Sequence, residues 1–151
     1  MVIKDPVLLD AGPLGLFANP RNTERTLAGR AWLAAMVAAG RRVLVPEIAD
    51  YEVRRELIRA RRVRGLANLD QLARQLEYLP LSTATMRKAA ELWAEARRQG
   101  QPTADDRALD CDVILAAQAL TMDVPGALIA TTNPEHINRF VTASRWEEIG
   151  P

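Results

Sequence analysis

The chain has few residues of several chemically important types, and each shortage excludes a class of site. Cys111 is the only cysteine among 151 residues, so the chain can form neither an internal disulfide nor a cysteine-rich zinc site. His136 is the only histidine, which excludes a metal site built on two histidines. We expect Cys111 to be a buried structural thiol and His136 to lie in a turn or on the surface.

Long apolar runs are also lacking. The most apolar region of the C-terminal half, residues 113–130, is interrupted by a glutamine, an aspartate, a proline and a glycine, so it cannot cross a bilayer as one helix. The first ten residues are typical of a strand rather than of the basic and apolar leader of a secreted protein. These features predict a soluble, cytoplasmic protein with no membrane partner.

Neither sign of charge is in excess. The formal net charge is +1, so any binding to nucleic acid must depend on a local basic patch rather than on the overall field. The only lysines are Lys4 and Lys88, and the other basic residues are arginines, whose planar guanidinium groups can bind phosphate through paired hydrogen bonds. Because 48% of the residues are hydrophobic and the length is usual for one domain, we expect residues 1–151 to form a single domain.

Short apolar runs alternate with longer segments whose apolar residues recur at helical spacing. We predict strands at Val7–Leu9, Val43–Val45, Tyr78–Leu81 and Leu128–Ala130, and an edge strand within residues 145–149. We predict helices at Asn22–Ala39, Glu47–Arg61, Leu66–Glu77, Ala84–Arg98 and Leu109–Thr121, a turn directly after Asp10, a break at Gly65 and a polar loop at Thr103–Arg107. Such alternation indicates an α/β fold with a mostly parallel sheet of four to five strands.

Four polar residues lie where predicted strands end or where predicted helices expose a face. Asp10 follows the first strand, and Asn133 follows the fourth. Glu52 lies beside the apolar stripe of a helix, with Glu56 as its nearest rival, and Asp112 opens a very apolar helix. Each has an ordinary structural explanation as a turn residue, a helix cap or a partner for a nearby arginine. However, ligands in parallel α/β sheets sit outside the carboxyl ends of the strands, so these side chains can share one pocket.

Carboxylates gathered in one pocket repel one another. A pair ~4 Å apart costs about 4 kcal/mol at an effective dielectric of 20, so the pocket needs either raised pKa values or a bound cation. Oxygen ligands favour Mg²⁺ or Mn²⁺ over zinc. Such an ion suits hydrolysis of a phosphodiester bond, because it lowers the pKa of a water and neutralises the attacked phosphate. Asn133 and Asp110 are further candidate ligands, and a second metal ion would need one of them.

This pattern resembles the PIN-domain ribonucleases, in particular the VapC-type toxins of bacterial and archaeal toxin–antitoxin pairs, over nearly the whole chain. The first acid of the family corresponds to Asp10 in the segment LLDAGPL, and its glutamate corresponds to Glu52 in VPEIADYE. Its third acid corresponds to Asp112 in LDCDVILAAQA, the most specific of the motifs. The fourth family position, often aspartate, is here Asn133 in ATTNP, with Asp105, Asp106 and Asp110 as spare acids nearby.

The resemblance implies a PIN-like, three-layer α/β/α sandwich and divalent-metal-dependent endonucleolytic cleavage of RNA. Asp10, Glu52 and Asp112 would be the catalytic and metal-binding residues, with Mg²⁺, or alternatively Mn²⁺, as cofactor. The resemblance also implies a homodimer and a small antitoxin protein that blocks the metal site.

Basic residues crowd the helix that carries Glu52 and the segment after it, at Arg54, Arg55, Arg59, Arg61, Arg62 and Arg64. We interpret Arg54, Arg55 and Arg59 as candidates for contact with RNA or with the antitoxin, together with Thr131 and Thr132. The alternative is a solvated helix face whose arginines are balanced by Glu52 and Glu56.

Other functions stay open from the sequence. The chain could be a housekeeping RNA-processing or structure-specific PIN nuclease, or a PIN module that binds nucleic acid without cleaving it. A phosphoacceptor domain of the receiver type fits less well, because it needs a lysine after its last strand and neither Lys4 nor Lys88 lies there.

Overall fold

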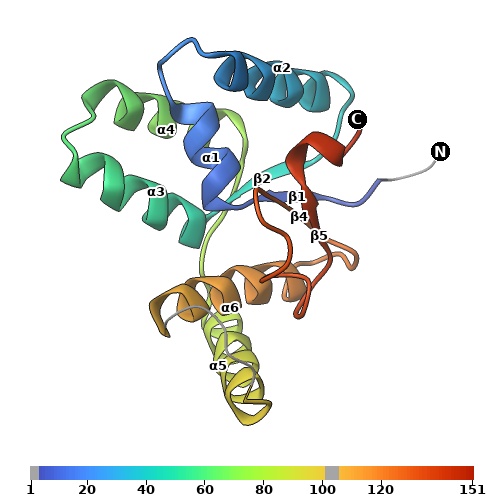
Figure 1. Cartoon of the computed structure of the whole chain (residues 1–151). Coiled ribbons are helices and arrows are strands. Elements are labelled where there is room, and N and C mark those ends of the chain that lie inside the picture. The colour runs from blue at the N-terminus through green and yellow to red at the C-terminus, as the bar shows by residue number, and fades with distance from the viewer. Residues whose placement is uncertain (1–3, 101–105) are drawn as a thin grey trace.

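The computed structural model describes residues 4–100 and 106–151, and within these ranges it contains five short strands and six α-helices (Figure 1). A pair of helices follows each of the first three strands. The strands are β1 (Val7–Leu9), β2 (Val43–Pro46), β3 (Glu77–Leu79), β4 (Leu128–Thr131) and β5 (Ala143–Arg145). The helices are α1 (Ala11–Ala18), α2 (Glu24–Ala38), α3 (Glu47–Arg59), α4 (Val63–Gln75), α5 (Thr83–Arg98) and α6 (Asp106–Leu120), and a short 3₁₀ helix η1 (Trp146–Glu148) follows β5. None of the helices in these ranges combines the length and the apolar character needed to cross a membrane.

All the strand pairs in the sheet are parallel, in the order β3-β2-β1-β4-β5. Leu8 of the central strand β1 is aligned with Leu44 of β2 on one side and with Ile129 of β4 on the other. The chain builds outward from β1 to β3 on one side and then crosses to β4 and β5 on the other side. The strand order therefore reverses between β1 and β4, which is where open α/β sheets bind their ligands.

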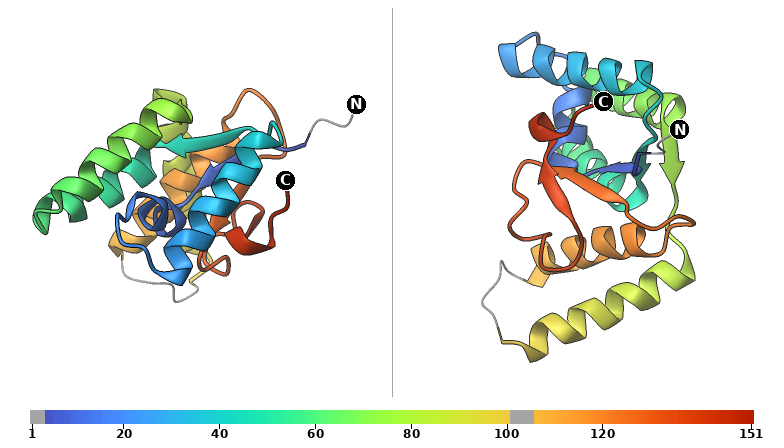
Figure 2. Two further views of the ribbon diagram at one scale, coloured as in Figure 1. Left: turned by 90° about the horizontal axis from the view of Figure 1, so that it is seen from above. Right: turned by 90° about the vertical axis from the view of Figure 1, so that its right-hand side faces the viewer.

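Successive residues of each strand point to opposite faces of the sheet, and both faces are covered by helices. Val7 and Leu9 pack in one buried cluster with residues of α1, α2, α3 and α4. Leu8 packs on the other face with Leu115 of α6, and α5 covers the outer side of α6 through a further cluster that includes Ala89. Figures 1 and 2 show these layers above and below the sheet, so the predicted α/β/α sandwich is confirmed.

Most of the predicted elements are confirmed with shifts of a few residues at their ends, but two features were predicted wrongly. The turn expected after Asp10 is the start of helix α1, because Asp10 caps it and Pro13 lies in the first turn, where a missing N–H costs nothing. Burial of Leu14 and Phe17 then stabilises a short helix that contains two glycines. Gly65 lies inside α4 rather than between helices, since its missing side chain makes room for Leu57 of α3.

The region before α6 also differs from the prediction. The helix begins at Asp106, three residues before the predicted start at Leu109. The polar loop predicted at Thr103–Arg107 is therefore partly helical, and its first residues, 103–105, lie outside the described ranges. At the end of the chain, the edge strand predicted within residues 145–149 is present as β5 at Ala143–Arg145, and the prediction was wrong for Trp146–Glu148, which form η1.

Aromatic residues form part of the core beneath α2 rather than a platform for stacking bases. Phe17, Trp32 and Trp146 pack with ring centroids 5.7–5.9 Å apart. Trp32 donates a hydrogen bond from Nε1 to the carbonyl of Ile149 at 2.8 Å, which fixes the C-terminal segment against α2.

The turn between α3 and α4 holds an arginine in a conformation that favours glycine. Arg61 has φ 55° and follows Ala60, the C-cap residue of α3. Its amide donates to Ile58 and the next amide, of Arg62, donates to Leu57 at 2.8 Å, which is the paired hydrogen bonding of a Schellman motif. A side chain at this left-handed position costs free energy that glycine avoids.

Replacing this arginine by glycine is expected to stabilise the fold. We predict that Arg61→Gly raises the free energy of unfolding by about 0.5–1 kcal/mol, because relief of the left-handed strain exceeds the greater entropy of glycine in the unfolded chain. The neighbouring Arg62 has φ −88°, so Arg62→Gly should lower that free energy. Urea unfolding of both variants measures the difference, and an Arg61→Gly protein less stable than the parent would contradict this account.

Candidate active site at the carboxyl edge of the sheet

Asp10 and Thr131 join the two strands between which the strand order reverses. Asp10 directly follows β1, and its Oδ1 accepts a hydrogen bond from the amide of Ala11 at 2.7 Å. Its Oδ2 accepts a hydrogen bond from the hydroxyl of Thr131, the last residue of β4, also at 2.7 Å. The Thr131 side chain is only 1% exposed, so the second bond is sheltered from water. These two bonds fix the orientation of the Asp10 carboxylate at the mouth of the sheet.

Close packing between α1 and the end of β4 keeps this arrangement tight. Gly12 lies in the first turn of α1, and a Cβ atom there would lie 2.8 Å from the hydroxyl oxygen of Thr132. Only a residue without a side chain allows this approach unless Thr132 moves. The sequence therefore needs glycine at position 12 to bring the capped start of α1 against β4.

Glu52 of α3 lies half-buried beside Asp10 and Asp112. Burial is the largest cause that raises the pKa of Glu52, and the carboxylates of Asp10 and Asp112 raise it further. The nearby guanidinium of Arg55 and a hydrogen bond with the thiol of Cys111 act in the opposite direction, and the resulting pKa is about 7. These effects show that the acids at the end of β1, on α3 and on α6 share one electrostatic environment.

Asp112 of α6 shows the same pattern. Burial is again the largest cause, and Asp10 is the second, so the pKa of Asp112 rises to about 6. His136 and Arg139, both from the segment after β4, lower that pKa. Their role was not apparent from the sequence, because no local motif links this segment to α6. His136 is exposed, as predicted.

Cys111 lies beside Glu52 and is half-buried rather than fully buried as predicted. Burial and the charge of Glu52 raise the pKa of its thiol to about 11, so the thiol stays protonated at neutral pH. A protonated thiol is a poor nucleophile, which leaves Cys111 as a hydrogen-bond donor to Glu52.

The three acids interact electrostatically, but their side chains are not arranged as a complete metal site. Among residues 4–100 and 106–151, no group of three or more histidine, cysteine, aspartate or glutamate side chains is arranged to hold a metal ion. Mg²⁺ is usually bound through only one or two carboxylates, together with waters and substrate phosphates. The donor set of Asp10, Glu52 and Asp112 consists of carboxylate oxygens alone, so its chemistry fits Mg²⁺ or Mn²⁺.

The other candidate ligands lie further from this centre. Asp110 is exposed and lines a hollow between α5 and α6 that also contains Trp93, so it faces away from the three acids. Asn133 is exposed, and its backbone N–H donates a hydrogen bond to the hydroxyl of Thr131 at 3.2 Å. Glu56 is exposed and forms an ion pair with Arg59 at 2.8 Å. Asp105 lies outside the described ranges.

The arginines of α3 fall into two groups. Arg54 forms ion pairs with Asp50 at 3.0 Å and with Asp70 of α4 at 2.8 Å, so it joins α3 to α4. Asp50, which the sequence did not single out, is buried and also accepts a hydrogen bond from Tyr78 at 2.6 Å. Arg55 is exposed, acts on Glu52 and lies over the ring of Tyr51. Arg55 is therefore the cation that adjoins the acidic site.

An open groove lies between α1 and α3, and Glu52 is the one of the three acids that lines it. Its volume is about 420 Å³, and it is lined by Ala11, Gly12, Gly15, Glu52, Val53, Arg55, Glu56 and Leu57. Acidic side chains thus lie at one end of a groove that is open to solvent. This geometry can admit a polymer or an extended segment rather than only a small molecule.

Solved structures share this architecture. The chain aligns with a chain of VapBC2 from Rickettsia felis bound to a DNA fragment from their promoter, with a TM-score of 0.71 and 16% identity over 93% of this chain and 98% of the other. The chain has a PIN-like fold. It also aligns with DNA-bound VapBC from Salmonella typhimurium, with a TM-score of 0.69 and 18% identity over 95% and 99% of the two chains. FitAcB from Neisseria gonorrhoeae aligns with a TM-score of 0.61 and 18% identity over 95% and 99%.

These structural likenesses confirm the fold expected for a VapC-type PIN domain. No family model matches the sequence, and no curated protein matches it either. At 15–18% sequence identity, these likenesses show that the chains share a fold. The likeness in fold covers 93–95% of this chain.

The raised pKa values predict an unusual dependence of stability on pH in the metal-free protein. Glu52 and Asp112 keep their protons in the folded state up to pH values of about 7 and 6, whereas their ordinary pKa values are 4.5 and 3.8. The folded state then binds more protons than the unfolded state, so this contribution to the free energy of unfolding falls as the pH rises from about 4 to 7.

Asp112→Asn should therefore stabilise the protein in chelator at pH 8, by on the order of 1 kcal/mol after allowance for partial exposure, and by less at pH 5. Asp110→Asn on the same helix is the matched control and should change stability by less than about 0.5 kcal/mol at both pH values. Thermal unfolding at the two pH values measures this. A loss of stability in Asp112→Asn at pH 8 would contradict the crowding of the acids.

Proposed function

We propose that this chain is a divalent-metal-dependent endoribonuclease that hydrolyses RNA phosphodiester bonds and acts as the toxin of a type II toxin–antitoxin pair. The observation that carries the proposal is the mutual effect of Asp10, Glu52 and Asp112 at the carboxyl edge of the sheet. This edge is where the strand order reverses, and the pocket opens into a groove. The PIN-like fold shared with VapBC structures supports the same conclusion.

Each acid has a distinct part in this proposal. Asp10 is held rigidly by Ala11 and Thr131 and presents a fixed carboxylate to a cation. Glu52, with a pKa of about 7, is partly protonated near neutral pH, and Asp112, with a pKa of about 6, keeps its proton in mildly acidic solution; both release these protons when a cation compensates their charge. When bound, a divalent cation would lower the pKa of a water and neutralise charge on the attacked phosphate. We propose Mg²⁺ as this ion, with Mn²⁺ as a substitute.

Thr131 acts in the proposal as a positioning residue. Its buried hydroxyl donates to Asp10 and accepts from the amide of Asn133, so it links the carboxylate to the segment after β4. This role differs from the contact with RNA or a partner that the sequence suggested, because the side chain is only 1% exposed. Thr132 is exposed and remains a candidate for such a contact.

Partners follow from the structural likenesses rather than from the site alone. The VapBC and FitAcB structures support a small antitoxin protein as the partner of this chain. We propose that it covers the groove between α1 and α3, and that the chain itself forms a homodimer. A housekeeping nuclease would have the same acidic site and lack the antitoxin, so co-purification with the product of a neighbouring gene separates the two.

Cleavage of RNA is the direct test. The parent chain should cleave single-stranded RNA in Mg²⁺ or Mn²⁺ and lose this activity in chelator. Asp112→Asn should lower the cleavage rate at least 100-fold, because it removes a charge at the proposed metal site. Asp110→Asn should cleave within about twofold of the parent, since its side chain lies on the other side of α6.

Circular dichroism of both variants checks that the fold survives. Equal rates for the parent and a folded Asp112→Asn protein would refute the assignment of the site. Binding of RNA without any cleavage by the parent in either metal would instead indicate a PIN module that binds nucleic acid.

A further inference from the structure

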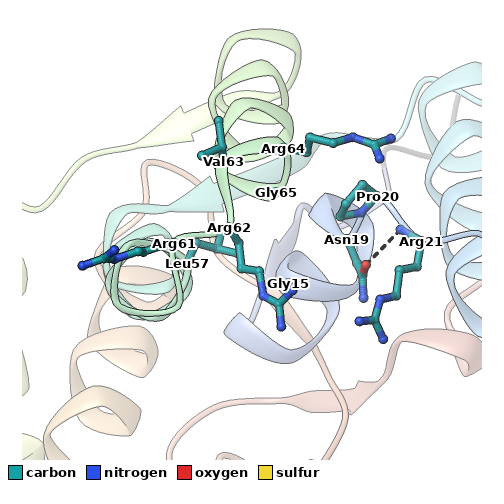
Figure 3. A pocket seen from close by; sticks show the side chains of 10 residues that line it. All are labelled: Gly15, Asn19, Pro20, Arg21, Leu57, Arg61, Arg62, Val63, Arg64 and Gly65. Atoms are coloured by element: carbon teal, nitrogen blue, oxygen red, sulfur yellow. Dashed lines mark hydrogen bonds between the residues drawn. The ribbon is translucent and has the colours of Figure 1, made fainter.

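An arginine-lined hollow lies next to the acidic groove, between α1 and the turn that joins α3 to α4. Its volume is about 600 Å³, and it is lined by Gly15, Asn19, Pro20, Arg21, Leu57, Arg61, Arg62, Val63, Arg64 and Gly65 (Figure 3). Gly15 and Leu57 also line the groove that contains Glu52. The two cavities therefore meet along α1 and α3, and one extended ligand can occupy both.

Three arginines surround this hollow from two separate segments. Figure 3 shows Arg62 extending toward Gly15, Arg64 extending over Pro20, and Arg21 on the opposite side, whereas Arg61 extends away from them. The left-handed conformation of Arg61 reverses the chain here and directs Arg62 back over α1. The loop that carries Arg21 is held in place by Arg30, which donates to the carbonyls of residues 19 and 21.

These arginines have their charges available. Within residues 4–100 and 106–151, no ion pair joins Arg21, Arg62 or Arg64 to a carboxylate. By contrast, two arginines of α3, Arg54 and Arg59, are paired with acids. The first turn of α4 faces the hollow and contains no acidic residue. The hollow is therefore a concentration of uncompensated positive charge in a molecule whose net charge is only +1.

We propose that Arg21, Arg62 and Arg64 bind a backbone phosphate of the RNA substrate beside the bond that is cleaved, an inference that rests on the proposed ribonuclease function. Guanidinium groups bind phosphate oxygens through paired hydrogen bonds. The carboxylate of Glu52 repels the RNA backbone, so a flanking cationic site supplies the attraction that holds the strand in the groove. RNA is favoured over an acidic protein segment because the hollow shares Gly15 and Leu57 with the groove that Glu52 lines.

The test is RNA binding in chelator, where no cleavage interferes. A fluorescently labelled single-stranded RNA is titrated with the parent chain, with a triple variant Arg21→Gln/Arg62→Gln/Arg64→Gln, and with a matched control Arg74→Gln/Arg87→Gln/Arg98→Gln. The control removes the same charge from exposed positions on α4 and α5 away from the hollow. Anisotropy at several salt concentrations gives both the affinity and its salt dependence, and circular dichroism checks the fold.

The hollow variant should bind RNA at least about 10-fold more weakly than the parent at 0.1 M salt, and the slope of log affinity against log salt should be shallower by about 0.7, as expected for the loss of one phosphate contact on a single strand. The control should stay within about twofold of the parent in affinity and keep its slope. Single Arg62→Gln and Arg64→Gln proteins provide the measurement if the triple variant does not fold.

Two results would overturn the inference. Equal weakening by the hollow variant and the control would show a general effect of charge, and parent-like binding by the hollow variant would assign the hollow to another ligand, such as an acidic segment of a partner protein. Either result leaves the proposed function intact as long as the parent cleaves RNA in Mg²⁺. A parent that neither binds nor cleaves RNA would refute the proposed function itself.

Discussion

Repulsion between buried carboxylates is the constraint on which the candidate site depends. Asp10 follows β1, Glu52 lies on α3 and Asp112 lies on α6. Asp10 raises the pKa of both other acids, and Asp112 also raises that of Glu52. Burial strengthens this repulsion because water is partly excluded from the acids. A protein would not gain stability from such a cluster, and in the proposed function a bound cation compensates it.

The sheet makes the crowding possible. Because all the strands are parallel, their carboxyl ends lie at one edge, and the reversal of strand order between β1 and β4 leaves an opening there. Asp10 reaches that opening directly from β1, and Thr131 of β4 fixes its orientation. The hollow around Arg62 lies on the side of this opening toward α4. It is lined by positive rather than negative side chains. One end of the groove thus suits a cation and the other end suits a phosphate.

The sequence predicted the strands, the parallel sheet and the acids at its edge, because apolar runs and their polar ends are local signals. It did not reveal α1, since Gly12 and Pro13 are typical of a turn and only burial of the helix against the core stabilises it. Asp110 could not be separated from Asp112 by spacing alone, because the direction of each side chain depends on how α6 packs. Nor could sequence show which arginines are already paired, since Asp50 and Asp70 meet Arg54 only after folding.

Binding of a divalent cation to the three acids is the central claim, and calorimetric titration with Mn²⁺ tests it most directly. The parent chain should bind the ion with an affinity that rises between pH 5.5 and 7.5, and binding should release protons from Glu52 and Asp112, seen as an observed heat that depends on the buffer. Glu52→Gln should weaken binding at least about 10-fold, whereas Asp110→Asn should not. Binding of Mn²⁺ that is equally tight in the parent and in Glu52→Gln, or no binding by the parent at any of these pH values, would contradict the account.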